Sequence, residues 1–207
     1  VVITLNNAYR LNNRFQDAFS VINKYYEEEK QAADGDEELL ALTSGFATLL
    51  VFLGIYDEAL EKSLEAFELA KHLYGADSPA LVNYLNNLAM AYGKAGDRET
   101  AVELYEEVLS DTVKFKGYNS ADTAIVLDNI GLSYGELGDY EKALKYDKEA
   151  NRMIVSLYGS RHPEAIASYS NLAWALGRNE ELEEAIKMHN LAIECCLRRY
   201  GEYSPRT

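Results

Sequence analysis

A pattern that recurs every 42 residues dominates this 207-residue sequence. The stretch SPALVNYLNNLAMAY at 78–92 returns as SADTAIVLDNIGLSY at 120–134 and as HPEAIASYSNLAWAL at 162–176. A weaker copy occupies residues 36–50. A fixed period of this size is typical of solenoids, in which each unit buries its apolar face against the next. The sequence therefore predicts a stack of similar units.

Recurring columns of residues predict the secondary structure of each unit. In its first half, apolar residues follow the spacing of one helix face, and one set is Leu85, Leu88, Ala89 and Tyr92. A left-handed residue can end that helix, and the column there is Gly54, Gly96 and Gly138, but Glu180 in the last repeat. A second helix follows, with a small contact residue in the column Ala59, Ala101, Ala143 and Ala185. A second glycine column ends it, at Gly75, Gly117, Gly159 and Gly201.

The start of each first helix also has a signature. The residue expected just before the helix is Ser78, Ser120, His162 or Ser204. A serine there can accept a hydrogen bond from an amide of the first turn. The prolines Pro79, Pro163 and Pro205 follow directly, where a missing amide costs nothing.

The predicted fold class is all-α, a solenoid of about five helix–turn–helix repeats in a single domain, 1–207. The repeats cover about 1–35, 36–77, 78–119, 120–161 and 162–203, and a further repeat begins at 204–207.

Composition narrows the classes of partner. Twenty basic residues against 34 acidic ones give a net charge of −14, which argues against nucleic acid and anionic membranes as partners. No apolar run nears the ~18 residues of a transmembrane helix. Cys195 and Cys196 are adjacent and lie in an apolar helical pattern, so we expect free, buried thiols and a cytoplasmic location.

No catalytic motif is present. The three histidines, His72, His162 and His189, lie at different phases of the repeat. Metal-ligand pairs such as HExxH and a glycine-rich phosphate loop after a strand are also missing from the sequence. The sequence predicts a protein that is not an enzyme and that binds no cofactor or metal.

The pattern resembles the tetratricopeptide repeat in its 42-residue form, as found in kinesin light chains. The resemblance rests on NNLAMAYGKAGDRETAVELYEEVL at 86–109, DNIGLSYGELGDYEKALKY at 128–146 and HPEAIASYSNLAWAL at 162–176. It implies a right-handed superhelix whose first helices line a concave groove that binds peptides or helices of partner proteins. The chain departs from the family in a second-helix column that is often aromatic, because that column reads Ser63, Tyr105, Asp147 and His189.

Under this resemblance, candidate ligand-binding residues lie on the first helices. The asparagine column Asn87, Asn129 and Asn171 can hydrogen-bond the backbone of an extended peptide, or it can bond a neighbouring helix or loop. The apolar column Thr48, Met90, Leu132 and Trp174 can form a side-chain pocket or pack between repeats. A glycine column, Gly93, Gly135 and Gly177, indicates close approach by a ligand or by a neighbouring helix. The full candidate set is Asn83, Asn86, Asn87, Met90, Lys94, Asp128, Asn129, Leu132, Glu136, Ser170, Asn171, Trp174 and Arg178.

The predicted function is a scaffold module that holds an extended peptide or a helix of a partner protein in the groove. One alternative is a ligand-sensing region of a larger bacterial regulator, switched by a signalling peptide. Another is a structural solenoid that self-associates through its end repeats.

Overall fold

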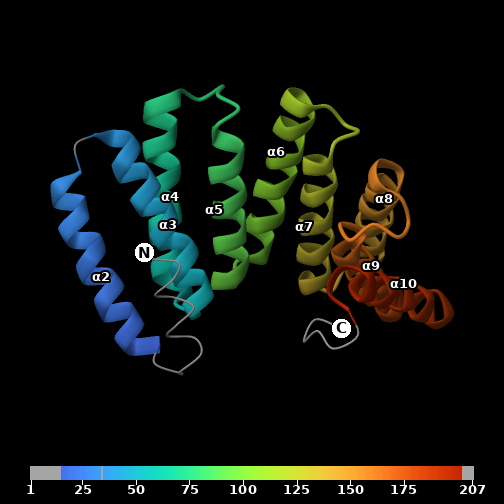
Figure 1. The fold of residues 1–207 in the computed structure, drawn as a ribbon. Helices are drawn as coiled ribbons and strands as arrows, with labels where there is room; N and C mark the ends of the chain where they lie inside the picture. Colours follow the sequence, from blue (N-terminus) through green and yellow to red (C-terminus); the bar gives the residue numbers. More distant parts are fainter. Residues whose placement is uncertain (1–14, 34, 202–207) are drawn as a thin grey trace. The chain divides into compact units, whose positions relative to one another are not determined.

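The computed structural model describes residues 15–33 and 35–201, and this part of the chain forms nine helices and no strand (Figure 1). The all-α prediction is confirmed. The helices are α2 (Phe15–Ala32), α3 (Asp36–Leu53), α4 (Tyr56–Tyr74), α5 (Leu81–Ala95), α6 (Arg98–Lys116), α7 (Ala121–Leu137), α8 (Tyr140–Tyr158), α9 (Ala165–Arg178) and α10 (Leu182–Tyr200). The chain divides into two compact units, Val1–Leu104 and Tyr105–Thr207.

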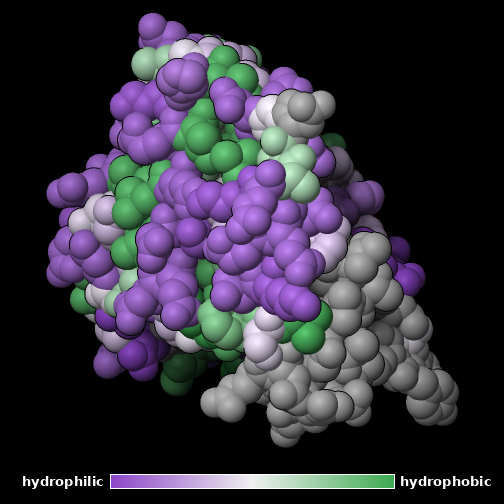
Figure 2. Space-filling view, turned by 90° about the vertical axis from the view of Figure 1, so that its left-hand side faces the viewer, coloured by the Kyte–Doolittle hydropathy of each residue, from purple (hydrophilic) through white to green (hydrophobic). Residues whose placement is uncertain are grey.

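In the first unit, α3 packs against both α2 and α4, and α4 packs against α5. Its core includes Tyr26, whose ring stacks on Phe46 with centroids 4.6 Å apart, and the buried Leu50 and Ala59. The outward side of α2, seen in Figure 2, is largely hydrophilic. This agrees with the acidic run at 25–30, in which Glu27 and Glu28 are exposed.

In the second unit, each of α7, α8 and α9 packs against the helix that follows it. One core cluster gathers Leu127, Met153, Tyr169 and Cys195 from all four helices. The predicted alanine contacts are confirmed in both units, because Ala59, Ala101, Ala143 and Ala185 are all buried. Cys195 and Cys196 are buried free thiols.

The tight turns between paired helices follow the predicted glycine column. Gly54, Gly96 and Gly138 have φ of 78°, 102° and 88°, the left-handed conformation that ends a helix. The fourth turn keeps this geometry without glycine, since Glu180 has φ 65°. The loss of glycine at 180 therefore changes the strain of the turn and not its path.

The predicted helix starts are correct in one repeat and wrong in two. Ser120 caps α7 by accepting a hydrogen bond from the Thr123 amide at 3.1 Å. Helices α5 and α9, however, begin at Leu81 and Ala165, three residues after Ser78 and His162. A turn comes first in these repeats, with the amides of Leu81 and Ala165 bonded to the carbonyls three residues back. Proline has no amide to donate at the second position of that turn. Ser204 lies outside the described residues.

Candidate functional site

Helices α7 and α9 are consecutive first helices of the second unit, and they contact each other. Each carries a stripe of exposed and half-buried side chains at matching positions 42 residues apart. We call these stripes together the α7/α9 face; its residues are Ile125, Asn129, Leu132 and Glu136 on α7 and Ala167, Asn171, Trp174 and Arg178 on α9. Leu132 and Trp174 are both 40% exposed, which is high for large apolar side chains.

The Trp174 ring packs directly on the backbone of α7 at Gly135. A Cβ atom at Gly135 would lie 2.6 Å from Cη2 of Trp174, closer than such atoms approach. Gly93 instead faces the Cβ of Ala101 at 3.4 Å, and Gly177 has no such atom within 4 Å. The glycine column was predicted to allow close approach by a ligand or by a neighbouring helix. At Gly135 the group that approaches is Trp174 of the neighbouring helix α9.

Tyr140 and Arg178 hold the Trp174 ring from other sides. The Arg178 guanidinium donates a hydrogen bond to the Tyr140 hydroxyl at 2.6 Å. Its central carbon lies 4.6 Å from the centre of the Tyr140 ring and 5.8 Å from that of Trp174. The two rings meet edge to face, with centroids 6.1 Å apart. Trp174 is therefore a fixed ring that leaves part of its surface open.

Two carboxyl groups are buried beneath this face. Asp128 on α7 and Asp147 on α8 are both buried, and Asp147 fits against α7 because residue 131 is glycine. A Cβ atom at Gly131 would lie 2.8 Å from Cγ of Asp147. In the described part of the chain, Oδ1 of Asp128 and both carboxylate oxygens of Asp147 have no hydrogen-bond partner.

Burial favours the neutral form of both acids. It raises the pKa of Asp128 to about 7, although a hydrogen bond from the Asn171 amide lowers that pKa in part. Burial, and then the nearby charge of Asp128, raises the pKa of Asp147 to about 8. The protonated form of the Asp147 carboxyl group is therefore favoured at neutral pH.

Several candidate residues have partners within the protein. Asn171 bonds Asp128, which is the alternative role considered for the asparagine column. The Ser170 hydroxyl donates to the Ile166 carbonyl at 2.9 Å, and Asp128 is buried away from the surface. Asn129 is half-buried, while Glu136 is exposed and helps to raise the pKa of buried Tyr105.

The remaining candidates lie in the first unit, on α5. Asn83 and Lys94 are exposed there, and Asn86, Asn87 and Met90 are half-buried. The structure therefore groups the candidates into one set on α5 and a second on α7 and α9.

Sequence reasoning missed Tyr140, Ile125 and the burial of Asp147. In the sequence, Asp147 stands out only as a departure from a column that is often aromatic in the family. The signal that could have found its burial is Gly131, the smallest residue of a column that otherwise holds alanine at 89 and 173.

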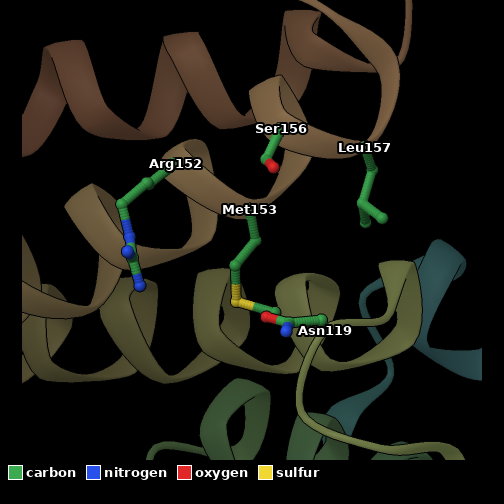
Figure 3. Close-up of a pocket in the computed structure, with 5 residues that line it drawn as sticks. All are labelled: Asn119, Arg152, Met153, Ser156 and Leu157. Atoms are coloured by element: carbon green, nitrogen blue, oxygen red, sulfur yellow. The ribbon is translucent and has the colours of Figure 1, made fainter.

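A pocket of about 250 Å³ lies elsewhere in the second unit (Figure 3). Arg152, Met153, Ser156 and Leu157 of α8 line it, together with Asn119 from the segment before α7. Arg152 is already engaged by Glu149, which also accepts a hydrogen bond from Tyr118 at 2.6 Å. The pocket contains none of the candidate residues.

No three His, Cys, Asp or Glu side chains in 15–33 and 35–201 lie close enough together to hold a metal ion. Within the same ranges, no helix combines the length and apolar character needed to cross a membrane.

Comparison with known proteins gives both family and fold. A family model described as tetratricopeptide repeat matches residues 38–110 and 122–198, more than half of the chain. No curated protein matches the sequence.

Three similar solved structures share the fold at low identity. BtubC (BKLC) from P. vanneervenii is 20% identical with a TM-score of 0.74, and the match covers 98% of this chain and 81% of that one. A putative kinesin light chain of Podosopora anserina, with nearly identical TPR-like repeats, is 20% identical with a TM-score of 0.73, over 96% and 95% of the two chains. PlcR of Bacillus thuringiensis, in complex with the peptide PapR7 and DNA, is 16% identical with a TM-score of 0.64, over 96% and 72%.

Proposed function

We propose a function from one premise: the chain belongs to the tetratricopeptide repeat family. Repeats of this family are generally protein–protein interaction modules. We infer that this chain is a scaffold that holds an extended peptide or a helix of a partner protein against its first helices. In the second unit the binding surface is the α7/α9 face, and in the first unit it is the exposed side of α5.

The observation that carries this proposal is the pair Leu132 and Trp174, each 40% exposed on adjacent helices. Binding energy in protein interfaces concentrates in a few large side chains, with tryptophan prominent among them. Trp174 is already fixed by Gly135, Tyr140 and Arg178, so binding would cost little side-chain entropy. An apolar side chain of the partner fits against this pair, and the Asn129 amide would then meet the partner's backbone.

The likeness to PlcR supports a peptide as the ligand, since that structure contains the peptide PapR7. It also favours the second candidate function, a ligand-sensing region of a larger bacterial regulator. Both functions use the same surface and differ in whether binding switches an attached domain. The buried free thiols of Cys195 and Cys196 fit a reducing, cytoplasmic setting for either function.

A phage-displayed random peptide library panned on the chain tests the proposal. Selected peptides are titrated while the emission of Trp174, the single tryptophan of the chain, is followed. We expect the emission to change on binding, and Leu132→Gln to weaken the selected peptides at least tenfold.

The matched control is Leu64→Gln on α4, because Leu64 is a similarly exposed leucine that belongs to neither proposed binding surface. Peptides that bind wild type and Leu132→Gln equally, without a change in Trp174 emission, would place the binding surface elsewhere.

A further inference from the structure

Asp128 lies at the edge of the exposed stripe of α7. It is about one helical turn from both Ile125 and Leu132, yet its side chain is buried where theirs are exposed. The side-chain amide of Asn171, on the neighbouring helix α9, donates a hydrogen bond to the Asp128 carboxyl group. Asn171 itself is half-buried and belongs to the α7/α9 face. Asp128 is therefore connected to the proposed binding surface through Asn171.

A carboxyl group at this position restricts the asparagine beside it. The positions 42 residues before and after Asp128 hold Asn86 and Ser170, which carry no charge. An ionised carboxylate only accepts hydrogen bonds, whereas an asparagine side chain can both donate and accept. While Asp128 is ionised, the bond between them therefore requires the NH2 group of Asn171. The carbonyl oxygen on the other branch of that planar amide is then directed away from Asp128.

The groups around Asp128 decide the pH at which it becomes ionised. Burial raises its pKa to about 7 against the effect of the Asn171 bond, and no cation among the described residues contributes. From α8 the titratable neighbour is Asp147, whose pKa is raised to about 8 by burial and then by the charge of Asp128. On α6, the pKa of buried Tyr105 responds to the charge of Glu136 instead. Asp128 therefore changes from a protonated acid to an acceptor as the pH rises through about 7.

We propose that Asp128 is a positioning residue for peptide binding, which holds the Asn171 side chain with its carbonyl oxygen presented to the ligand. This inference rests on the proposed function, because it requires a peptide on the α7/α9 face. Asn171 then accepts a hydrogen bond from one backbone N–H of that peptide. Proline has no backbone N–H and is excluded at that position of the ligand. The face thus recognises one N–H of the peptide in addition to the apolar side chain that fits against Leu132 and Trp174.

Backbone ester substitution in the phage-selected peptides tests whether Asn171 accepts such a bond. Each amide of a peptide is replaced in turn by an ester, which removes one N–H, and the affinity is measured through Trp174 emission at pH 8.5. We expect one position at which the ester weakens binding to wild type by up to about tenfold. Asn171→Ala should bind that ester and the parent peptide equally, because the acceptor is gone.

Asp128→Asn tests whether Asp128 sets this preference. Asparagine at 128 can donate or accept, so Asn171 is no longer held in one orientation, and the ratio of amide to ester affinity should fall about threefold or more. The matched control is Asp122→Asn, the same change at an exposed aspartate of α7, which should leave the ratio unchanged. Wild type at pH 5.5 gives a second measurement without any variant. Protonated Asp128 can donate to Asn171, so the ratio should fall there too, and any effect of pH common to both peptides cancels.

The outcomes separate this inference from the proposed function. If Leu132→Gln weakens the selected peptides but no ester depends on Asn171, the peptide function holds and the positioning role is overturned. An ester preference that low pH or folded Asp128→Asn leaves unchanged also overturns it, because Asn171 then accepts without help from Asp128. Circular dichroism checks folding, and if Asp128→Asn loses its helices, the pH comparison on wild type decides. If no peptide binds, the proposed function fails and this inference fails with it.

Discussion

At the scale of single residues, Asp128 and Asp147 stand out in the second unit because their carboxyl groups are buried and have oxygens without a hydrogen-bond partner. A buried ionised carboxylate without partners is costly, so such groups keep a proton and shift their pKa upward. The pKa values of about 7 and about 8 place this change within the ordinary range of pH. Among described groups, the only hydrogen bond favouring the charged form of Asp128 is that from Asn171.

The stability of the second unit should therefore fall as pH rises. Between about pH 4, the ordinary aspartate pKa, and pH 7–8, the folded state holds more protons than the unfolded state, so the free energy of unfolding decreases with pH. Asp147→Asn removes the group with the higher pKa and should lose less stability than wild type between pH 5 and pH 8.

Urea unfolding midpoints at the two pH values measure the effect. Asp77→Asn, in an exposed loop, is the control and should keep the wild-type dependence on pH. If Asp147→Asn shows the same pH dependence as wild type, Asp147 is not a buried, protonated acid in the folded protein.

Asn129 is the residue-scale test of the peptide hypothesis. Losing one hydrogen-bond partner in an interface costs on the order of 0.5–1.5 kcal/mol, so Asn129→Ala should weaken a selected peptide by up to about tenfold. Because the amide would meet the peptide backbone, different peptide sequences should weaken alike. Fluorescence titration measures the affinity, and exposed Glu107→Ala provides the control. Normal binding together with easier unfolding of Asn129→Ala would make Asn129 structural.

At the scale of the helical elements, the turn between α9 and α10 is strained where the other turns are not. Glu180 adopts φ 65°, and a side chain in the left-handed region costs roughly 1–2 kcal/mol. Glu180→Gly removes that strain but adds freedom to the unfolded chain, which offsets roughly 0.5–1 kcal/mol. The variant should therefore be more stable than wild type by about 0.5–1 kcal/mol.

The adjacent residue is the matched control for that substitution. Glu181 has φ −81°, so Glu181→Gly relieves no strain and also removes a pairing with Lys148 at 3.4 Å. It should be less stable than wild type in the same urea titration. Two variants that shift the midpoint in the same direction would show that the turn stores no strain.

The elements were largely predictable from sequence because the 42-residue columns encode them. Helix periodicity, the turn glycines and the alanine contacts are local or recur in each repeat, so one repeat supports the interpretation of the next. The starts of α5 and α9 were not predictable from the serine and histidine columns, since a proline turn competes with the helix there. The set Trp174, Tyr140 and Arg178, and the buried Asp147, depend on packing between helices, which column spacing does not specify.

At the scale of the whole molecule, net charge is the property that no single repeat reveals. The chain carries −14, and the acidic residues gather in runs such as 25–30, 34–38 and 179–185. A compact state with this excess charge repels itself, while exposed ion pairs contribute only ~0–1 kcal/mol each. When salt screens these charges, the loss of repulsion between acidic residues should therefore affect stability more than the loss of attraction within the ion pairs.

Added salt should then raise the melting temperature at neutral pH. Raising ionic strength from about 0.01 M to about 0.15 M shortens the Debye length from about 30 Å to about 8 Å, which screens repulsion between separate acidic runs. Thermal unfolding followed by circular dichroism measures the shift at fixed protein concentration. The shift should shrink as pH approaches the isoelectric point, about 4.7, because the net charge then approaches zero. A melting temperature that falls with salt at neutral pH would mean that the surface ion pairs, such as Lys30 with Glu65 at 3.0 Å, stabilise the fold more than the excess charge destabilises it.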